Sequence, residues 1–153
     1  YTEKLMAENV RLMIIGKVEG LSVSLQKKIA AVTAQTALND GLTFTIALNY
    51  GGRDEIVRAA KAFAADVAAG KCSADSLTEE VLSGYLDSAG VPDPELVIRP
   101  SGEQRTSNFL PWQTVYSEFV FMDVLWPDFD RAEFDRALES YSRRERRMGG
   151  RLK

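Results

Sequence analysis

Short apolar runs that alternate with helical patterns constrain the fold of this chain more than any other feature. Compact apolar runs lie near residues 10–15, 42–50, 95–99 and 118–124, and each has the length of a strand. Helices are predicted from about Ser22 to Leu38, from about Gly52 to Ala69, from about Ser76 to Leu86 and from about Arg131 onward. Strands alternating with helices predict an α/β fold, with a mainly parallel sheet flanked by helices.

The length and composition predict one domain with a substantial core. The chain has 153 residues and 45% hydrophobic residues, and no linker or repeat divides it, so we expect a single α/β domain over residues 1–153. A net charge of −3 argues against nucleic acid as a partner, because such binding needs a basic surface. The single cysteine, Cys72, excludes an internal disulfide and fits a reducing, cytoplasmic compartment.

The absence of histidine restricts the chemistry further. Without histidine, Ser-His-Asp and Cys-His catalysis are excluded, and with one cysteine zinc sites are excluded as well. Carboxylates, hydroxyls, arginines and lysines remain. This set suits a substrate whose leaving group is already good, such as a diphosphate assisted by Mg²⁺.

A polar loop follows the third apolar run, where open α/β sheets place ligand sites. It carries Arg99, Ser101, Arg105 and Ser107, whose forked donors and hydroxyls suit phosphate oxygens. Glu118, which begins the fourth run, offers the hard oxygen ligand that Mg²⁺ prefers. The loop is therefore the leading candidate for a phosphate site.

Three further segments carry weaker signals. The turn from Asn49 to Gly52 leads from a strand into a helix, and its glycines allow backbone N–H groups to approach a ligand or a neighbouring backbone. The simplest interpretation of the basic segment from Arg143 to Arg151 is a solvated helix end, whose cationic side chains complement the helix dipole. The run 42–50 alternates, with Leu42, Phe44 and Leu48 on one face, as in a core strand.

Three motifs resemble the cis-prenyltransferases, the undecaprenyl or polyprenyl diphosphate synthases. They are IRPSGEQRTSNFLPWQTVYSEFVFMDVLWPDF from Ile98, NYGGRDEI from Asn49 and RERRMGG from Arg144, in the family's order. The resemblance extends over essentially the whole chain and implies the C-terminal two-thirds of such an enzyme. Enzymes of this family condense isopentenyl diphosphate with an allylic diphosphate, with Mg²⁺, to give a cis-polyprenyl diphosphate such as the cell-wall lipid carrier.

The resemblance also implies roles for individual residues. Arg99, Arg105 and Ser107 would hold the diphosphate of isopentenyl diphosphate, and Glu118 would help to bind Mg²⁺ near a homodimer interface. Arg147 and Gly149 would reach the partner subunit's site as part of an Arg-x-Gly motif. Part of the apolar strand face, with Leu42, Phe44 and Leu48, would line a tunnel for the lipid tail. Peripheral membrane association for product release is a further implication.

The sequence departs from the family pattern in three places. Pro100 stands where many members have threonine, and it restricts Arg99 to extended conformations. Gln104 stands where some members have histidine. The family's N-terminal part is missing, so the catalytic aspartate is expected upstream of Tyr1, and residues 1–153 are expected to be inactive on their own.

Two classes of function compete. The first is a prenyltransferase, and the alternative is a non-catalytic partner subunit that lends its Arg-x-Gly tail to a catalytic chain. A pure partner would need the tail but not Arg99, Arg105 and Ser107. Because both sets are present, the sequence favours the enzyme.

Overall fold

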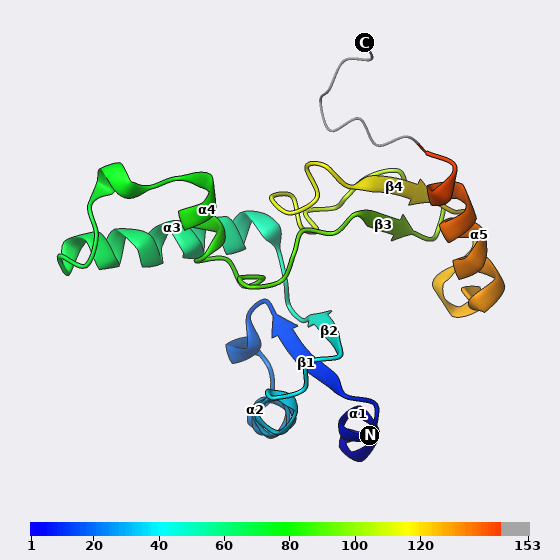
Figure 1. The fold of residues 1–153 in the computed structure, drawn as a ribbon, viewed down its shortest axis with the longest axis horizontal. Coiled ribbons are helices and arrows are strands. Elements are labelled where there is room, and N and C mark those ends of the chain that lie inside the picture. The colour runs from blue at the N-terminus through cyan, green and yellow to red at the C-terminus, as the bar shows by residue number, and fades with distance from the viewer. Residues whose placement is uncertain (145–153) are drawn as a thin grey trace, which may run out of the picture. The chain divides into compact units, whose positions relative to one another are not determined.

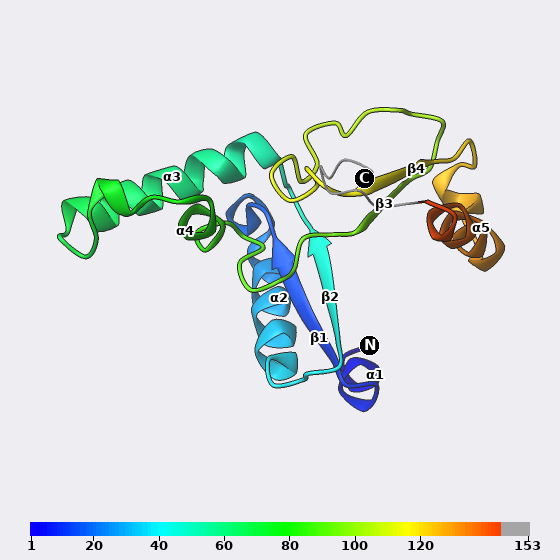
Figure 2. The same ribbon diagram turned by 45° about the horizontal axis from the view of Figure 1, so that its top comes forward.

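The computed structural model of this chain describes residues 1–144. The chain forms two compact units, Tyr1–Gly90 and Val91–Lys153, called unit 1 and unit 2 below. Each unit contains one pair of parallel strands and its own helices, which Figures 1 and 2 show from two directions. The predicted α/β class with parallel strands is confirmed, and the prediction of one domain over residues 1–153 stays a prediction.

Unit 1 is built on two parallel strands with a helix packed beside them. Strand β1 (Val10–Ile15) pairs with β2 (Leu42–Ala47) in parallel, and Val10 lies opposite Leu42. The crossover between them is α2 (Val23–Thr36), which begins at the N-cap Ser22 and packs against β1 (Figure 2). A short helix, α1 (Thr2–Ala7), precedes β1 and contacts both β1 and α2.

The second half of unit 1 is helical and differs in extent from the prediction. Strand β2 ends at Ala47 rather than at residue 50, because Asn49 takes a left-handed φ of 48° and the chain then turns into α3 (Gly52–Ala68). The next helix, α4 (Glu79–Ser83), is shorter than predicted. It starts after Thr78, whose hydroxyl accepts from the Val81 N–H, and it ends at Gly84.

Between residues 91 and 144, unit 2 carries the second parallel pair and one long helix. Strand β3 (Leu96–Arg99) pairs with β4 (Glu118–Phe121), and α5 (Arg131–Ser142) packs against β4 (Figure 1). The fourth strand ends at Phe121 rather than at residue 124, because the carbonyls of Met122 and Val124 accept from the loop amides of Gly102 and Ser101. The residues that follow β4 therefore bind the start of the polar loop.

Candidate functional site

The loop between β3 and β4 is held in an unusual backbone conformation. Ser101, Ser107, Asn108 and Leu110 all have positive φ values, between 48° and 80°. Side chains other than glycine adopt this region only at a cost, and such strain clusters at ligand sites. The start of the loop is fixed by the Ser101 N–H bond to the Val124 carbonyl and the Gly102 N–H bond to the Met122 carbonyl, both 2.8 Å. The backbone at the start of the candidate site is therefore held in place by hydrogen bonds to the segment after β4.

The two predicted clamp arginines border one small cavity. Arg99 and Arg105 both line a hollow of about 60 Å³ in unit 2, whose remaining walls are mainly apolar and include Phe109 and Phe119. Arg99 Nη2 lies 3.5 Å from Ser107 Oγ, at the limit of a hydrogen bond. Arg105 is exposed and forms an ion pair with Glu103. The structure thus brings Arg99, Arg105 and Ser107 together, with Glu103 as a carboxylate neighbour that the prediction did not include.

Glu118 lies at the start of β4 and is paired with a cation. Its carboxylate Oε2 accepts from Arg144 Nη1 at 2.9 Å, and its side chain is 29% exposed. Within residues 1–144, no group of three or more Cys, Asp or Glu side chains could hold a metal ion. Glu118 therefore offers a single hard oxygen donor of the kind that Mg²⁺ prefers, outside any group of three or more such side chains in the described residues.

A second polar cluster lies where β1 and β2 end in unit 1, and most of it was not predicted from the sequence. Asp87 Oδ2 accepts the Gly16 N–H at 2.8 Å, and both oxygens of Asp87 accept from the Arg58 guanidinium at 2.7 and 2.6 Å. Arg58 Nε also donates to Asp54 at 3.0 Å, and Asp54 accepts from Lys17 at 2.5 Å. One chain of ion pairs thus connects Lys17, in the turn after β1, with α3 and the segment after α4.

A buried carboxylate continues this cluster. Glu55 is only 1% exposed, and its carboxylate accepts from the Tyr50 hydroxyl at 2.5 Å and from the Asp87 N–H at 2.9 Å. The burial of Glu55 could have been predicted from the sequence. Glu55, Ala59 and Phe63 follow one another at intervals of four residues, so they share one face of α3, and all three are buried. A carboxylate on an apolar face indicates a specific polar contact. Asp87 lies in an irregular segment and gives no comparable signal.

The ion pairs shift the titration of their members. The hydrogen bonds from Arg58 lower the pKa of Asp87 below its usual range. Together with the Gly16 N–H, they outweigh desolvation, which raises the pKa. The pKa of Asp54 is lowered by its hydrogen bonds to Lys17 and Arg58. The pKa of Arg58 is raised by the hydrogen bond to Asp87. These groups therefore stay charged at neutral pH.

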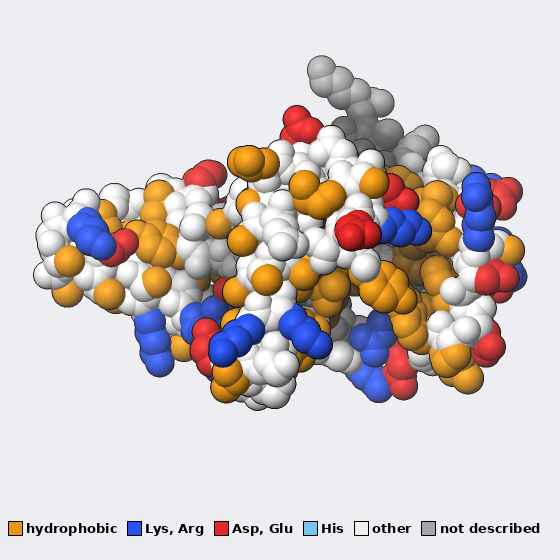
Figure 3. Space-filling model, turned by 90° about the horizontal axis from the view of Figure 1, so that it is seen from below, with side chains coloured by type: hydrophobic (Ala, Val, Ile, Leu, Met, Phe, Trp, Pro, Cys, Tyr) orange, Lys and Arg blue, Asp and Glu red, His pale blue; other side chains and the backbone are white. Residues whose placement is uncertain are grey.

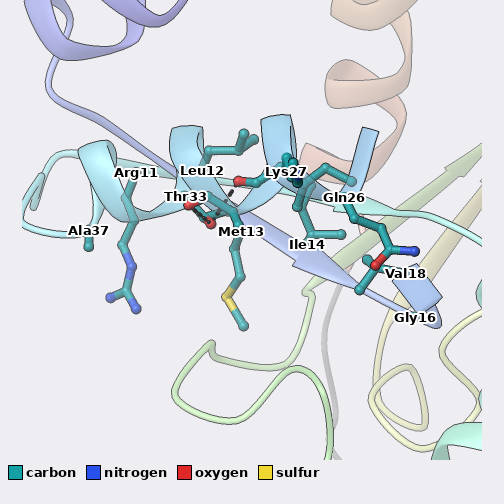
Figure 4. A pocket seen from close by; sticks show the side chains of 12 residues that line it. Arg11, Leu12, Met13, Ile14, Gly16, Val18, Gln26, Lys27, Thr33 and Ala37 are labelled. Atoms are coloured by element: carbon teal, nitrogen blue, oxygen red, sulfur yellow. Dashed lines mark hydrogen bonds between the residues drawn. The ribbon is translucent and has the colours of Figure 1, made fainter. Parts of the chain in front are cut away.

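The residues predicted to line a lipid tunnel lie on β2 and just beyond it. Leu42 and Phe44 are 65% and 48% exposed, whereas Leu48 is half-buried. Figure 3 shows one face of the molecule, on which apolar side chains reach the surface in several places. A separate open hollow of about 690 Å³ lies between β1 and α2, where Arg11 and Met13 extend to one side of the strand (Figure 4).

Two predicted site residues, Arg147 and Gly149, lie outside the described residues. Up to residue 144, the chain contains no helix that is both long and apolar enough to cross a bilayer.

The family comparison matches nearly the whole chain. Residues 1–149 match the family model described as "Putative undecaprenyl diphosphate synthase". Similar relatives are isoprenyl transferases from Agrobacterium fabrum, 51% identical over 95% of this chain, and from Thermotoga maritima, 51% identical over 97%. The matched part makes up 59% and 63% of those two relatives, so the chain spans about three fifths of their length.

Solved structures agree with this comparison. A lavandulyl diphosphate synthase from Lavandula x intermedia, solved with dimethylallyl diphosphate, is 36% identical with a TM-score of 0.90, over 95% of this chain and 63% of that one. A probable undecaprenyl diphosphate synthase from Campylobacter jejuni is 38% identical with a TM-score of 0.81, over 97% of this chain and 67% of that one. The fold and the sequence therefore match the same kind of protein.

Proposed function

Because the chain belongs to the undecaprenyl diphosphate synthase family, we propose that the whole protein is a cis-prenyltransferase. It would condense isopentenyl diphosphate with an allylic diphosphate to give a cis-polyprenyl diphosphate. The observation that carries the proposal beyond family membership is the meeting of Arg99 and Arg105 on one cavity, with Ser107 beside Arg99. The alternative, a non-catalytic partner subunit, has no support in the comparisons.

The loop would bind the diphosphate of isopentenyl diphosphate. Each guanidinium presents a planar fork of donors that matches two phosphate oxygens, and the Ser107 hydroxyl can donate to a third. The Glu103 carboxylate competes with the substrate for Arg105, so we expect diphosphate binding to break that ion pair. The preset backbone of residues 101–110 would lower the entropic cost of binding.

Mg²⁺ is proposed as the cofactor, with Glu118 as a ligand. When bound, the metal would neutralise charge on the diphosphate leaving group. Glu118 would have to exchange the Arg144 guanidinium for the metal, since its Oε2 accepts from Arg144 in this structure. Because the chain spans about three fifths of its relatives' length, we propose that the catalytic aspartate of the family resemblance lies outside these 153 residues.

The lipid product would follow the strand β2 of unit 1. Leu42, Phe44 and Leu48 are proposed to line its path, consistent with the exposure of Leu42 and Phe44. Arg147 and Gly149 are proposed to act at the site of a second subunit. Association with a membrane surface, through which a long lipid product would leave, also belongs to this proposal.

Replacing Arg105 with alanine in the full-length protein tests the diphosphate clamp. We expect the KM for isopentenyl diphosphate to rise and kcat/KM to fall on the order of 10–100-fold, since charged hydrogen bonds contribute about 1.5–3 kcal/mol. Steady-state kinetics with each substrate varied in turn measure this. Arg131→Ala is the matched control, because Arg131 is also exposed and paired with a nearby carboxylate of unit 2. Unchanged kinetics in Arg105→Ala would refute the assignment of the loop.

A further inference from the structure

The Arg58–Asp87 pair is tied directly to the backbone at the end of β1. Arg58 binds both oxygens of Asp87, and the same carboxylate accepts the Gly16 N–H at 2.8 Å. Arg58 and Asp87 are both partly exposed, with 36% and 18% of their side-chain surface accessible. A forked pair of this kind fixes both partners in orientation as well as in distance. The position of Gly16 therefore depends on the pair.

Gly16 in turn presses against the backbone that ends β2. A Cβ placed on Gly16 would lie 2.2 Å from the Leu48 carbonyl oxygen and 3.0 Å from the Tyr50 Cα, so the two backbones are in direct contact. Two hydrogen bonds join the same segments, from the Leu48 N–H to the Ile15 carbonyl at 2.9 Å and from the Lys17 N–H to the Asn49 carbonyl at 3.3 Å. A shift of Gly16 must therefore shift residues 48–50.

Residues 48–50 lie at the edge of the sheet where a ligand is expected. β1 and β2 are parallel and both end here, and open α/β sheets bind ligands beyond the carboxyl ends of their strands. Leu48 is also one of the residues proposed to line the path of the prenyl chain. The pair thus acts on a segment that the proposed function places beside the prenyl substrate.

We infer that Arg58 and Asp87 are positioning residues for the prenyl substrate, acting through Gly16 on the backbone of Leu48 to Tyr50. The inference rests on the proposed prenyltransferase function. Neither side chain touches substrate in this role. Each fixes the shape of the binding edge, and the lowered pKa of Asp87 keeps the carboxylate charged for this purpose. The pair should therefore affect substrate binding more than the chemical step.

The test uses Asp87→Asn and Arg58→Lys in the full-length protein. For Asp87→Asn, the KM for the allylic diphosphate should rise on the order of tenfold while kcat stays within about threefold. Arg58→Lys should give a smaller rise in the same direction, because an ammonium cannot bind both carboxylate oxygens as a fork. Hydrogen exchange at the Gly16 amide should become faster in Asp87→Asn, which reports the lost contact directly.

Asp66→Asn is the matched control. Asp66 lies on α3, the helix that also carries Arg58. Its carboxylate accepts from Lys71 at 2.7 Å and from Tyr85 at 2.8 Å. Asp66→Asn therefore loses a similar ion pair, but one that lies away from the strand ends. Its KM should equal that of the unmodified protein, with all variants assayed below their unfolding temperatures. If Asp87→Asn and Arg58→Lys match Asp66→Asn, or lose kcat alone, the inference is wrong. If the unmodified protein does not condense the two substrates, the proposed function itself is wrong.

Discussion

At the level of single residues, the ionised carboxylates of unit 1 link stability to pH. Asp87 and Asp54 have pKa values lowered in the folded state by their hydrogen bonds to Arg58 and Lys17. In the unfolded chain both would titrate near the ordinary value of about 4. A lowered folded-state pKa stabilises the fold above the unfolded-state pKa. That stabilisation is lost as the pH falls through the folded-state value, because the unfolded state then binds more protons.

This linkage gives a prediction for Asp87→Asn. The variant should unfold at lower urea than the unmodified protein near pH 7, and the gap should shrink as the pH approaches about 3. Urea unfolding followed by circular dichroism at several pH values measures both midpoints. Asp75→Asn, at an exposed position in the same unit, is the control and should show a smaller gap near pH 7. A gap for Asp87→Asn that does not change with pH would contradict the prediction.

The site residues that could be predicted from the sequence are those whose chemistry depends on a local motif. Arg99, Arg105 and Ser107 lie within nine residues of one another, so one loop places them together whatever the rest of the fold does. Asp87 could not be found in this way. Its partners Gly16 and Arg58 are distant in the sequence, and only the packing of the chain brings them together. The Glu118–Arg144 contact, between β4 and the end of α5, escaped prediction for the same reason.

At the level of elements, strand positions were predictable and strand ends were not. All four strands of the described residues lie inside the predicted apolar runs, which are rich in the β-branched and aromatic side chains that favour strands. Two strands end earlier than predicted, since their ends depend on contacts with other segments. Asn49 turns the chain away from β2 through a left-handed φ. After β4, the Met122 N–H still donates to the Arg99 carbonyl, but the Met122 carbonyl accepts from Gly102 of the polar loop.

Gly16, just after β1, is a position where substitution should be costly. Its φ is +100° and a Cβ there would meet the Leu48 carbonyl oxygen, so Gly16→Ala should destabilise the protein by about 3 kcal/mol. Gly70→Ala separates the cost of the positive φ from the cost of the steric contact. Gly70 also has a positive φ, of 71°, but nothing lies within 4 Å of its Cβ position, so only the backbone cost of about 1 kcal/mol applies. Denaturant unfolding measures both, and equal losses would show that the close approach costs nothing.

At the level of the whole molecule, the exposed apolar side chains of unit 2 indicate an interface. Tyr116 and Trp126 are each 71% exposed, and other large apolar residues of the segment 108–126 are also exposed, namely Phe109, Val115, Phe121 and Leu125. Exposed apolar side chains of this size, close together in the sequence, are typical of surfaces that bind another protein. We propose that a second copy of the chain covers them in a twofold dimer.

Two measurements on the full-length protein test this assembly. Light scattering should give the mass of a dimer. Truncation before Arg146, which removes the proposed Arg147 and Gly149 contribution to the partner's site, should abolish activity and leave the dimer mass unchanged. A monomer, or a truncated protein that remains fully active, would count decisively against the model. Truncation that also dissociates the dimer would show that the tail contributes to assembly instead.

The parallel pairing of the strands also has a consequence for how the chain reaches its native state. Val10 pairs with Leu42, and the whole of α2 separates them in the sequence. Leu96 pairs with Glu118, and the polar loop separates these two. Neither pair can therefore form as a local hairpin. The loop-closure entropy is lost before any ladder hydrogen bond compensates for it, which slows folding. During that interval the strand edges are unpaired and prone to aggregate, so the recovery of native protein should depend on concentration and on chaperones.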